Sequence, residues 1–418
     1  MNLRPWMCRI PKGFAVLATG TLFLAMMGST ANAQQSANHR GKSLLWADNG
    51  PRTRATSNAR PMQRSAGSIS ANDSNVKYKA VPIGVLPGKT NSVIAEEVNV
   101  INDLGHVVGF SFVDTGDVHD YYLTAQAFLW KNGKLKALPL LKGWPGAFAT
   151  GINDRDQVIG EANNFDSNGN RTRTAILWDE GGVIDLGTLD SNSNSAAFGI
   201  SNWGIAVGFN QSRSDGHNTP VVWYGGKIHA LPLLPGDSDG FAFGINDFGV
   251  ISGYQQQPGD ISETACLWYW NGSGYTAVAL GNLGGDYSEA FGVNIWGQAV
   301  GFSLYAGDLH GPAVLWDWRG PHALPMLPGD TDGEATAIND LEQIVGFSQL
   351  FDDYGDLLSE RVVLWQNGKV TDLQTVVPAD TADLTDVGNV NLSGEIAIQA
   401  GYFDDGTLGA YVLIPKDH

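Results

Sequence analysis

Cysteine is almost absent from this chain, which has two in 418 residues. Cys8 lies in an N-terminal segment that we expect to be removed, so Cys266 would be the only cysteine of the mature protein. One thiol can form neither an internal disulfide nor a metal site built from several cysteines. Cys266 stands in the apolar sequence 265–268, and we therefore interpret it as a small buried residue rather than a nucleophile.

Long apolar runs are missing beyond the N-terminus, which argues against a membrane-spanning helix. Residues 1–33 combine three basic side chains, a mostly apolar stretch from Gly13 to Met27, and the small residues Ala31 and Ala33. This order is typical of a secretory signal peptide that is cleaved after Ala33. No cysteine follows that site, so the signal is not of the lipoprotein type. We expect a secreted protein, either extracellular or periplasmic.

Positive charge is scarce, because 25 Lys and Arg oppose 43 Asp and Glu, for a formal net charge of -18. Residues 34–75 are rich in Ser, Ala, Asn and Arg and have almost no apolar periodicity, so we predict a disordered basic linker there. Nearly all of the acidic side chains fall in residues 76–418. Such an acidic domain argues against nucleic acids and anionic membranes as partners, since both require neutralisation of phosphates.

Sustained helical periodicity is missing as well, and a sequence repeat is found instead. The segment 151–160, followed by Trp178, is one of seven copies, which we number repeats 1 to 7. Each copy is anchored on a turn residue, and successive anchors are 45 to 52 residues apart. The anchors are Asn102, Asn153, Ser201, Asn246, Asn294, Asn339 and Asn391.

Each repeat contains short apolar segments bounded by Gly, Asn, Asp or Pro, which is the pattern of β-strands. Four strands in about 45 residues is the size of a propeller blade. We therefore predict an all-β fold over residues 76–418, a seven-bladed β-propeller with four-stranded antiparallel blades. Residues 77–86 match a fourth strand without the first three, and the chain ends on a third strand. We expect this N-terminal strand to complete the last blade.

Several short motifs resemble the HAF family of extracellular repeat proteins. They are Gly-Ile-Asn-Asp at 151–154 and 244–247, Val-Val-Gly-Phe at 107–110, Ala-Phe-Leu-Trp at 127–130, Asp-Leu-Gly-Thr-Leu at 185–189 and Tyr-Val-Leu-Ile-Pro at 411–415. The resemblance covers residues 76–418, and its specificity comes from seven repeats in register. It implies a secreted repeat protein and no established activity. The signature His of the family is replaced here by Gln126, Thr174, Thr219, Thr264, Pro312 and Val362, so a role that depends on that His does not carry over.

Three residue types recur in nearly every repeat, and we interpret all three as structural. The anchor side chain is expected to bond a backbone N–H two residues later, as in an Asx turn. The Gly seven positions after the anchor is expected to mark a close approach between sheets, with the repeated Trp as its neighbour. That Trp recurs in the centre of a strand, so we place it in the core rather than in a sugar site: Trp130, Trp178, Trp223, Trp268, Trp316 and Trp365.

Loop lengths indicate which face carries function. In a four-stranded antiparallel blade, the turns between strands 1 and 2 and between strands 3 and 4 share one face. The loops between strands 2 and 3 and the links between blades share the other face. These 2–3 loops vary in length, and variable loops on a regular scaffold usually carry function. Our candidate ligand-binding residues there are His119, Asp120, Tyr121, Tyr122, Asp215, His217, Asp308 and His310.

Three chemistries are open for this face. Asp237 and Asp239, like Asp330 and Asp332, stand in Asp-x-Asp-Gly links that resemble fragments of calcium loops, although turn chemistry is the preferred explanation because the ligand set is incomplete. The histidines of repeats 1, 3 and 5 could converge on the central mouth as metal ligands or as an acid–base pair, or remain separate surface residues. Pairs of carboxylates for glycoside cleavage could assemble across the same mouth.

Our first hypothesis is a secreted, monomeric, non-enzymatic β-propeller without a cofactor. It would bind a glycan, a cell-wall component or an extracellular protein through the 2–3 and 4–1 loop face. The second hypothesis is a carbohydrate-active enzyme, a polysaccharide lyase or glycoside hydrolase, with its site at the central mouth of that face. A third is a purely structural or matrix-interaction module. The sequence does not name the ligand.

Overall fold

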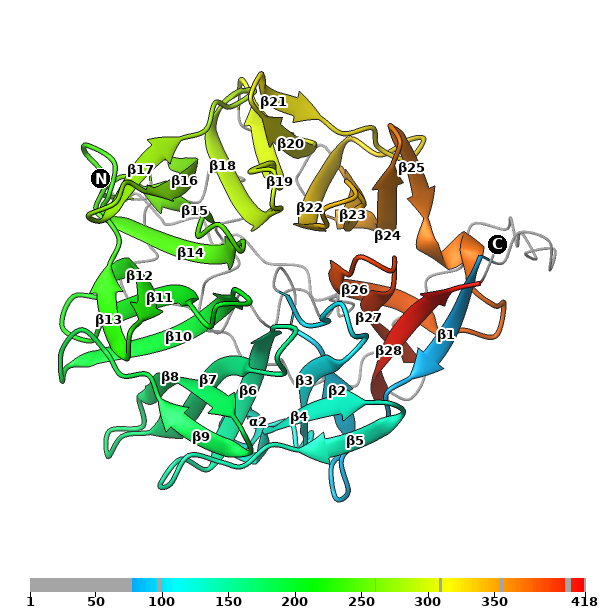
Figure 1. The fold of residues 1–418 in the computed structure, drawn as a ribbon. Coiled ribbons are helices and arrows are strands. Elements are labelled where there is room, and N and C mark those ends of the chain that lie inside the picture. The colour runs from blue at the N-terminus through cyan, green and yellow to red at the C-terminus, as the bar shows by residue number, and fades with distance from the viewer. Residues whose placement is uncertain are drawn as a thin grey trace, which may run out of the picture.

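The protein is an all-β propeller in which four-stranded antiparallel blades are arranged radially around a common centre (Figure 1). The computed structural model describes residues 77–95, 99–259, 261–307, 310–352, 357–402 and 407–416. The predicted signal peptide and the predicted basic linker lie outside these residues. No helix in the described part of the chain is long and apolar enough to cross a membrane.

The strands of each repeat pair with one another in chain order. Repeats 1 and 2 comprise β2 (Asn91–Val93), β3 (Val107–Phe112), β4 (Gln126–Lys131) and β5 (Lys134–Ala137), then β6 (Gly146–Ile152), β7 (Val158–Phe165), β8 (Arg171–Asp179) and β9 (Gly182–Asp185). Repeats 3 and 4 comprise β10 (Ser193–Ile200), β11 (Ala206–Ser212), β12 (Asn218–Tyr224) and β13 (Lys227–Ala230), then β14 (Asp239–Ile245), β15 (Ile251–Gln256), β16 (Glu263–Trp270) and β17 (Tyr275–Ala279). Repeats 5 and 6 comprise β18 (Gly284–Val293), β19 (Ala299–Tyr305), β20 (Ala313–Asp317) and β21 (Gly320–Ala323), then β22 (Asp332–Ile338), β23 (Ile344–Phe351), β24 (Leu357–Gln366) and β25 (Lys369–Asp372). Repeat 7 comprises β26 (Asp383–Val390), β27 (Ile396–Tyr402) and β28 (Thr407–Pro415).

Hydrogen bonding divides these strands into five separate four-stranded sheets and one eight-stranded sheet. The eight-stranded sheet contains repeats 4 and 5, because β16 and β18 are joined by a parallel bridge between Glu263 and Tyr287. The predicted count of seven separate blades is therefore not confirmed. The bridge is a single pair of residues, whereas the antiparallel ladders within repeats 4 and 5 extend over several pairs each.

The N-terminal strand closes the ring, as predicted. Strand β1 (Tyr78–Pro82) pairs antiparallel with β28, so that Tyr78 faces Pro415 and Pro82 faces Tyr411. In Figure 1 the blue strand β1 lies beside the red strand β28. The observed strand is shorter than the predicted segment 77–86. Ile83 and Leu86, which follow it, are buried in the core.

The repeated Trp is a core residue, as predicted, and it also bonds to the preceding repeat. The six Trp side chains are at most 8% exposed. In repeats 2, 4, 5 and 6 the indole N–H donates to a backbone carbonyl just after the fourth strand of the preceding repeat: Trp178 to Pro139, Trp268 to Pro232, Trp316 to Gly281 and Trp365 to Pro325, at 2.6 to 2.8 Å. Each bond links neighbouring repeats while satisfying a buried donor.

The repeated Gly contacts its own sheet rather than a neighbouring one, which corrects our prediction. A Cβ on Gly160, Gly208 or Gly253 would overlap a backbone carbonyl oxygen of the first strand of the same repeat. The ladder between the first two strands of these repeats also shifts register close by, at a β-bulge. The Trp side chain is among the three nearest neighbours of that Cβ position at Gly253, where Trp268 lies 2.9 Å away.

A short helix lies within the segment between strands 2 and 3 of repeat 1, where we predicted a loop. Helix α2 (Val118–Thr124) begins after Asp117, whose side chain accepts a hydrogen bond from the N–H of His119. A 3₁₀ helix, η4 (Leu373–Val376), follows β25. Cys266 is buried, as expected, and burial raises the pKa of its thiol far above the usual range, which makes it a poor nucleophile.

Candidate functional site

Two of the predicted histidines form equivalent hydrogen bonds to Asp side chains of the next repeat. His217 Nδ1 lies 2.9 Å from Asp239 Oδ2, and His310 Nδ1 lies 2.9 Å from Asp332 Oδ2. The other oxygen of each Asp accepts a backbone N–H from the 2–3 segment of the preceding repeat, from Asn218 at 2.8 Å and from Gly311 at 3.0 Å. Each Asp therefore joins the first strand of one repeat to the 2–3 segment of the repeat before it.

The contact between His217 and Asp239 changes the pKa of His217. The hydrogen bond to Asp239, together with its charge, raises the pKa of His217 above the ordinary value of 6.5. Both members belong to loop or link segments that we predicted as functional. The sequence did not reveal that they pair, because 22 residues separate them.

The repeat 1 candidates have a different environment. His119 Nδ1 lies 3.2 Å from Asp117, and its ring lies 4.4 Å from that of Phe165. Asp120 accepts a hydrogen bond from the Thr115 hydroxyl at 2.8 Å. Tyr121 and Tyr122 are buried at 3% and 8% exposure among Phe side chains, so they belong to the aromatic core. The three histidines therefore have three different Asp partners.

Three of the four calcium candidates bond to other side chains of the protein. Asp239 and Asp332 bond to the two histidines. Asp330 accepts one hydrogen bond from the Ser348 hydroxyl and forms an ion pair with Arg361, both at 2.6 Å. Burial raises the pKa of Asp237. Within the part of the chain that the structure describes, no three His, Cys, Asp or Glu side chains gather as metal ligands. Asp215 accepts the N–H of His217, and Asp308 lies outside the described residues.

The opposite face contains a ring of hydrogen bonds through the anchor residues. As predicted, the Oδ1 of each anchor Asn accepts backbone N–H groups of its own turn; in repeat 1 these come from Leu104 and His106. The Nδ2 of each anchor Asn also donates to the carbonyl of the next anchor, which the sequence did not predict. The donor and acceptor pairs are Asn102 and Asn153, Asn153 and Ser201, Asn246 and Asn294, Asn294 and Asn339, Asn339 and Asn391, and Asn391 and Asn102.

A second set of bonds joins the residues that follow the anchors. The N–H of Asp103 donates to Asp154 Oδ1 at 2.8 Å, and the N–H of Leu392 donates to Asp103 Oδ1 at 2.8 Å. Burial raises the pKa of Asp103, and the charges of Asp154, Asp340 and Asp247 raise it further. The carboxylates of three other turns therefore act on Asp103.

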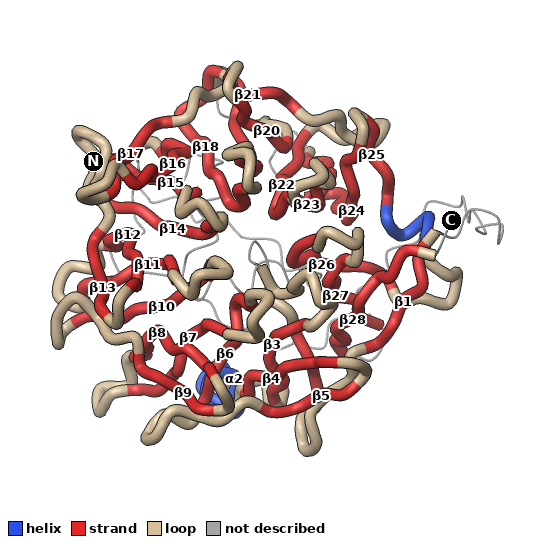
Figure 2. Tube along the Cα trace, in the orientation of Figure 1, coloured by secondary structure: helices blue, strands red, loops and turns tan. Residues whose placement is uncertain are grey.

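Large apolar side chains are exposed in this set of 1–2 turns. Five turns carry a large apolar residue two positions after the anchor, each between 58% and 73% exposed. We call this set the turn ring: Leu104, Trp203, Phe248, Trp296 and Leu341. Figure 2 shows these turns, in tan, around the centre of the molecule. Arg155 and Ser393 occupy the same position in repeats 2 and 7.

The two Trp side chains of the turn ring are held in place. The indole N–H of Trp203 donates to the carbonyl of Asp247, and that of Trp296 donates to the carbonyl of Asp340, both at 3.0 Å. Each indole therefore lies against the next turn and keeps most of its surface open to solvent. A ring that is fixed before binding loses little conformational freedom when a ligand stacks on it.

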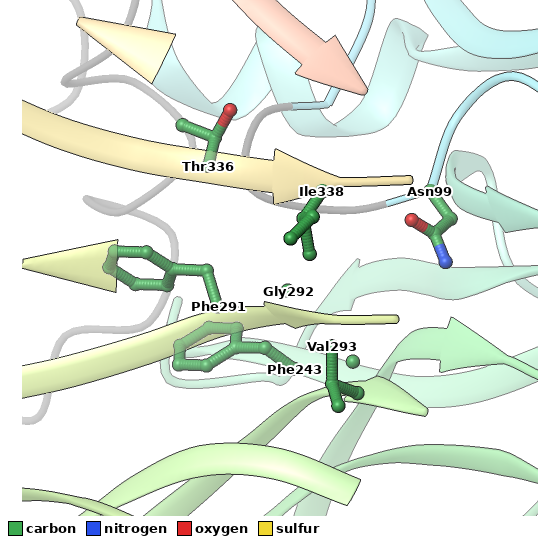
Figure 3. A pocket seen from close by; sticks show the side chains of 8 residues that line it. Asn99, Phe243, Phe291, Gly292, Val293, Thr336 and Ile338 are labelled. Atoms are coloured by element: carbon green, nitrogen blue, oxygen red, sulfur yellow. The ribbon is translucent and has the colours of Figure 1, made fainter. Parts of the chain in front are cut away.

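A small hollow lies at the inner strand ends from which the turns of repeats 4 to 6 emerge. Phe243, Phe291 and Ile338 line it, together with Asn99 and Thr336 (Figure 3). The lining residues are close to the ends of β14, β18 and β22, and the turns that carry Phe248, Trp296 and Leu341 begin a few residues later. The turn ring and the hollow thus belong to the same central region.

The turn ring offers groups that can contact a ligand. Planar aromatic faces offer stacking surfaces, and the neighbouring carboxylates accept hydrogen bonds. Asp103 and Asp154 already accept backbone N–H groups, which fixes their position. We missed this site because we took the uniform 1–2 turns as purely structural. The sequence feature that could have indicated this site is a Trp, Phe or Leu at a turn position that polar residues and Gly usually occupy.

No family model matches the sequence, and no curated protein matches it. Solved structures with a similar fold include the β-propeller domain of the trilobed protease from Pyrococcus furiosus, with 8% identity and a TM-score of 0.42 over 78% of this chain and 95% of that chain. An acylaminoacyl peptidase from Pyrococcus horikoshii has 10% identity and a TM-score of 0.47 over 81% and 54%. A gluconolactonase from Xanthomonas campestris has 11% identity and a TM-score of 0.33 over 63% and 83%. At these identities the likeness concerns the fold alone.

Proposed function

We propose that the protein is a secreted, non-enzymatic β-propeller that binds a glycan through the turn ring. The observation that supports this most directly is the set of five large apolar side chains that are exposed at equivalent positions of the 1–2 turns. Isolated exposed apolar residues are common on proteins, but a set gathered at one place marks a binding surface. Our prediction of the 2–3 and 4–1 loop face stays a prediction.

A glycan fits the chemistry of this surface. The C–H face of a sugar ring is apolar and packs on an indole or phenyl face, while its hydroxyl groups donate to carboxylates. Trp203 and Trp296 supply fixed aromatic faces, and Asp247 and Asp340 lie beside them. An extracellular protein is the other partner class that our sequence analysis left open.

The blade count and the cellular location are part of the same proposal. We count the eight-stranded sheet as two blades, which gives seven blades, because its two halves follow the strand order of the other repeats and meet at one bridge. Membership of the HAF family, secretion behind a cleaved signal peptide, a monomeric state and the absence of a cofactor are proposed on the sequence features given above.

A glycan array tests this function. The mature chain beginning at Gln34 is compared with the double variant Trp203→Ala/Trp296→Ala, and we expect retention by the native chain and its loss in the variant. The variant Trp318→Ala is the matched control, because Trp318 is 90% exposed but lies in a 3–4 turn. Retention of no glycan, or equal retention by the double variant, would refute the proposal.

A carbohydrate-active enzyme remains the second candidate because of the two His–Asp pairs. An imidazole oriented by a carboxylate is the arrangement of a general base. His217 and His310 are each about half exposed, so a substrate could reach them. This function predicts that polysaccharides are shortened during incubation with the native chain, and that His217→Ala or His310→Ala abolishes the products. Unchanged polymer length would exclude it.

A further inference from the structure

A second group of aromatic side chains continues from the turn ring toward the rim of the molecule. The hydroxyl of Tyr275 lies 3.5 Å from the point that a Cβ on Gly249 would occupy, and Gly249 directly follows Phe248 of the turn ring. The ring of Tyr275 then meets that of Trp270, with centroids 5.3 Å apart. Trp270 is 47% exposed, so its indole adds open aromatic surface next to the turn ring.

The group crosses from repeat 4 to repeat 3. The rings of Trp270 and Tyr224 are 6.1 Å apart, and Tyr224 stacks on His229 at 4.2 Å. Tyr224 ends β12, and His229 lies on β13, the outermost strand of repeat 3. We call this set the aromatic track: Tyr275, Trp270, Tyr224 and His229.

The track departs from the turn chemistry of the other repeats. Between strands 3 and 4, repeats 1 and 6 have the tight Asn-Gly turns 132–133 and 367–368. Repeat 4 has a longer turn, flanked by Trp270 and Tyr275, that a hydrogen bond from Asn271 to Thr276 orders at 2.9 Å. Reversing the chain between two antiparallel strands requires only a tight turn. Tyr224 and Tyr275 are partly buried against the apolar core beneath them, so the exposed indole of Trp270 is the aromatic group that neither strand reversal nor core packing explains.

The shape of the track and the charge of the chain indicate which class of ligand binds there. The track is a line of single rings beside polar groups such as the Asn271 amide, whereas a stable protein interface needs a broad apolar centre. The chain carries a net charge of -18, and the turn beside the track carries Asp247. An acidic polymer would be repelled, so charge complementarity favours a polymer without acidic groups.

We propose that the turn ring and the aromatic track together bind a linear, uncharged polysaccharide, with successive sugar rings from the turn ring to the rim between repeats 3 and 4. This inference rests on the proposed glycan-binding function of the turn ring and adds the length and charge class of the ligand. The turn ring holds one part of the chain, and Trp270 stacks on a sugar ring further out.

The test uses native affinity electrophoresis of the mature chain in gels that contain hydroxyethylcellulose, laminarin, galactomannan or polygalacturonate. We expect retardation by at least one of the three uncharged polymers and none by polygalacturonate. For the polymer that binds, calorimetry then compares its disaccharide with its hexasaccharide. We expect tighter binding of the hexasaccharide, and Trp270→Ala to weaken hexasaccharide binding about threefold to tenfold, the range of one aromatic contact, without changing disaccharide binding.

Matched variants separate this inference from the function on which it rests. Trp318→Ala, on an exposed turn outside the track, leaves both affinities unchanged. If Trp203→Ala/Trp296→Ala abolishes binding while Trp270→Ala has no effect on the hexasaccharide, the track is refuted and the turn ring stands. Equal affinity for both lengths, or binding of polygalacturonate, also refutes the track. Binding of none of the three uncharged polymers refutes the inference, and the glycan array decides separately on the function.

Discussion

The side-chain amide of Asn391 donates a hydrogen bond to the backbone carbonyl of Asn102 at 3.0 Å, although 289 residues separate the two. The bond joins the last repeat to the first within the ring of anchors. It lies on the face of the turn ring, opposite the 2–3 loops. Closure of the propeller therefore depends on this contact in the centre as well as on the pairing of β1 with β28 at the rim.

Replacing Asn391 by Ala is expected to lower the free energy of unfolding by more than about 2 kcal/mol. Its Oδ1 accepts the N–H groups of Ser393 and Glu395 at 3.0 and 2.9 Å, and these buried or half-buried groups lose their partner. Urea denaturation measures the change. Ser393→Ala in the same turn is the control, because that side chain is exposed, and it should alter stability by less than about 0.5 kcal/mol. Equal stability of the two variants would contradict the role of Asn391.

Removing residues 77–86 is expected to destabilise the fold by more than about 4 kcal/mol, because Tyr78, Ile83 and Leu86 are buried. The loss also exposes the edge of β28, so the truncated chain should aggregate more readily. Thermal and urea unfolding are compared with those of a chain that begins at Lys77. If both chains unfolded at the same urea concentration, the pairing of β1 with β28 would not contribute to stability, and the prediction would be wrong.

Gly253→Ala is expected to destabilise the protein by about 3 kcal/mol or to prevent folding. The added Cβ would overlap the carbonyl oxygen of Phe241 on β14, and that carbonyl cannot move without disturbing the β14–β15 ladder. Gly274→Ala is the matched control, since no atom lies within 4 Å of its Cβ position. Circular dichroism during urea unfolding distinguishes them. A Gly253 variant as stable as the Gly274 variant would show that the bulge can relax.

Asp239→Asn is expected to lower the pKa of His217 toward 6.5. The bond to Asp239 raises that pKa in the folded protein, so it stabilises the fold fully at pH below 6.5, and this contribution is lost as the pH rises through the folded pKa. NMR titration of the His217 ring measures the shift. Asp317→Asn, which removes the partner of His322, should leave the His217 titration unchanged. An unaltered His217 pKa in Asp239→Asn would refute the pairing in solution.

Much of the fold was predictable because its determinants recur along the sequence. Anchor residues, a Gly and a Trp at fixed offsets predicted strands, Asx turns and a buried Trp layer, and the orphan N-terminal segment predicted closure. The Gly contact was misjudged, because a bulge is a relation between two strands that spacing alone does not reveal. The bridge from Glu263 to Tyr287 escaped prediction for the same reason.

The sequence by itself determined the repeat, the strand order within it and therefore which loops share a face. Only the tertiary structure decided which side chains meet there. Trp203 and Asp247 are 44 residues apart, yet they touch because the ring places equivalent turns side by side. One exposed apolar residue in one turn carries little information, whereas circular closure gathers five such turns at the centre of the propeller, and that proximity is what makes them a candidate site.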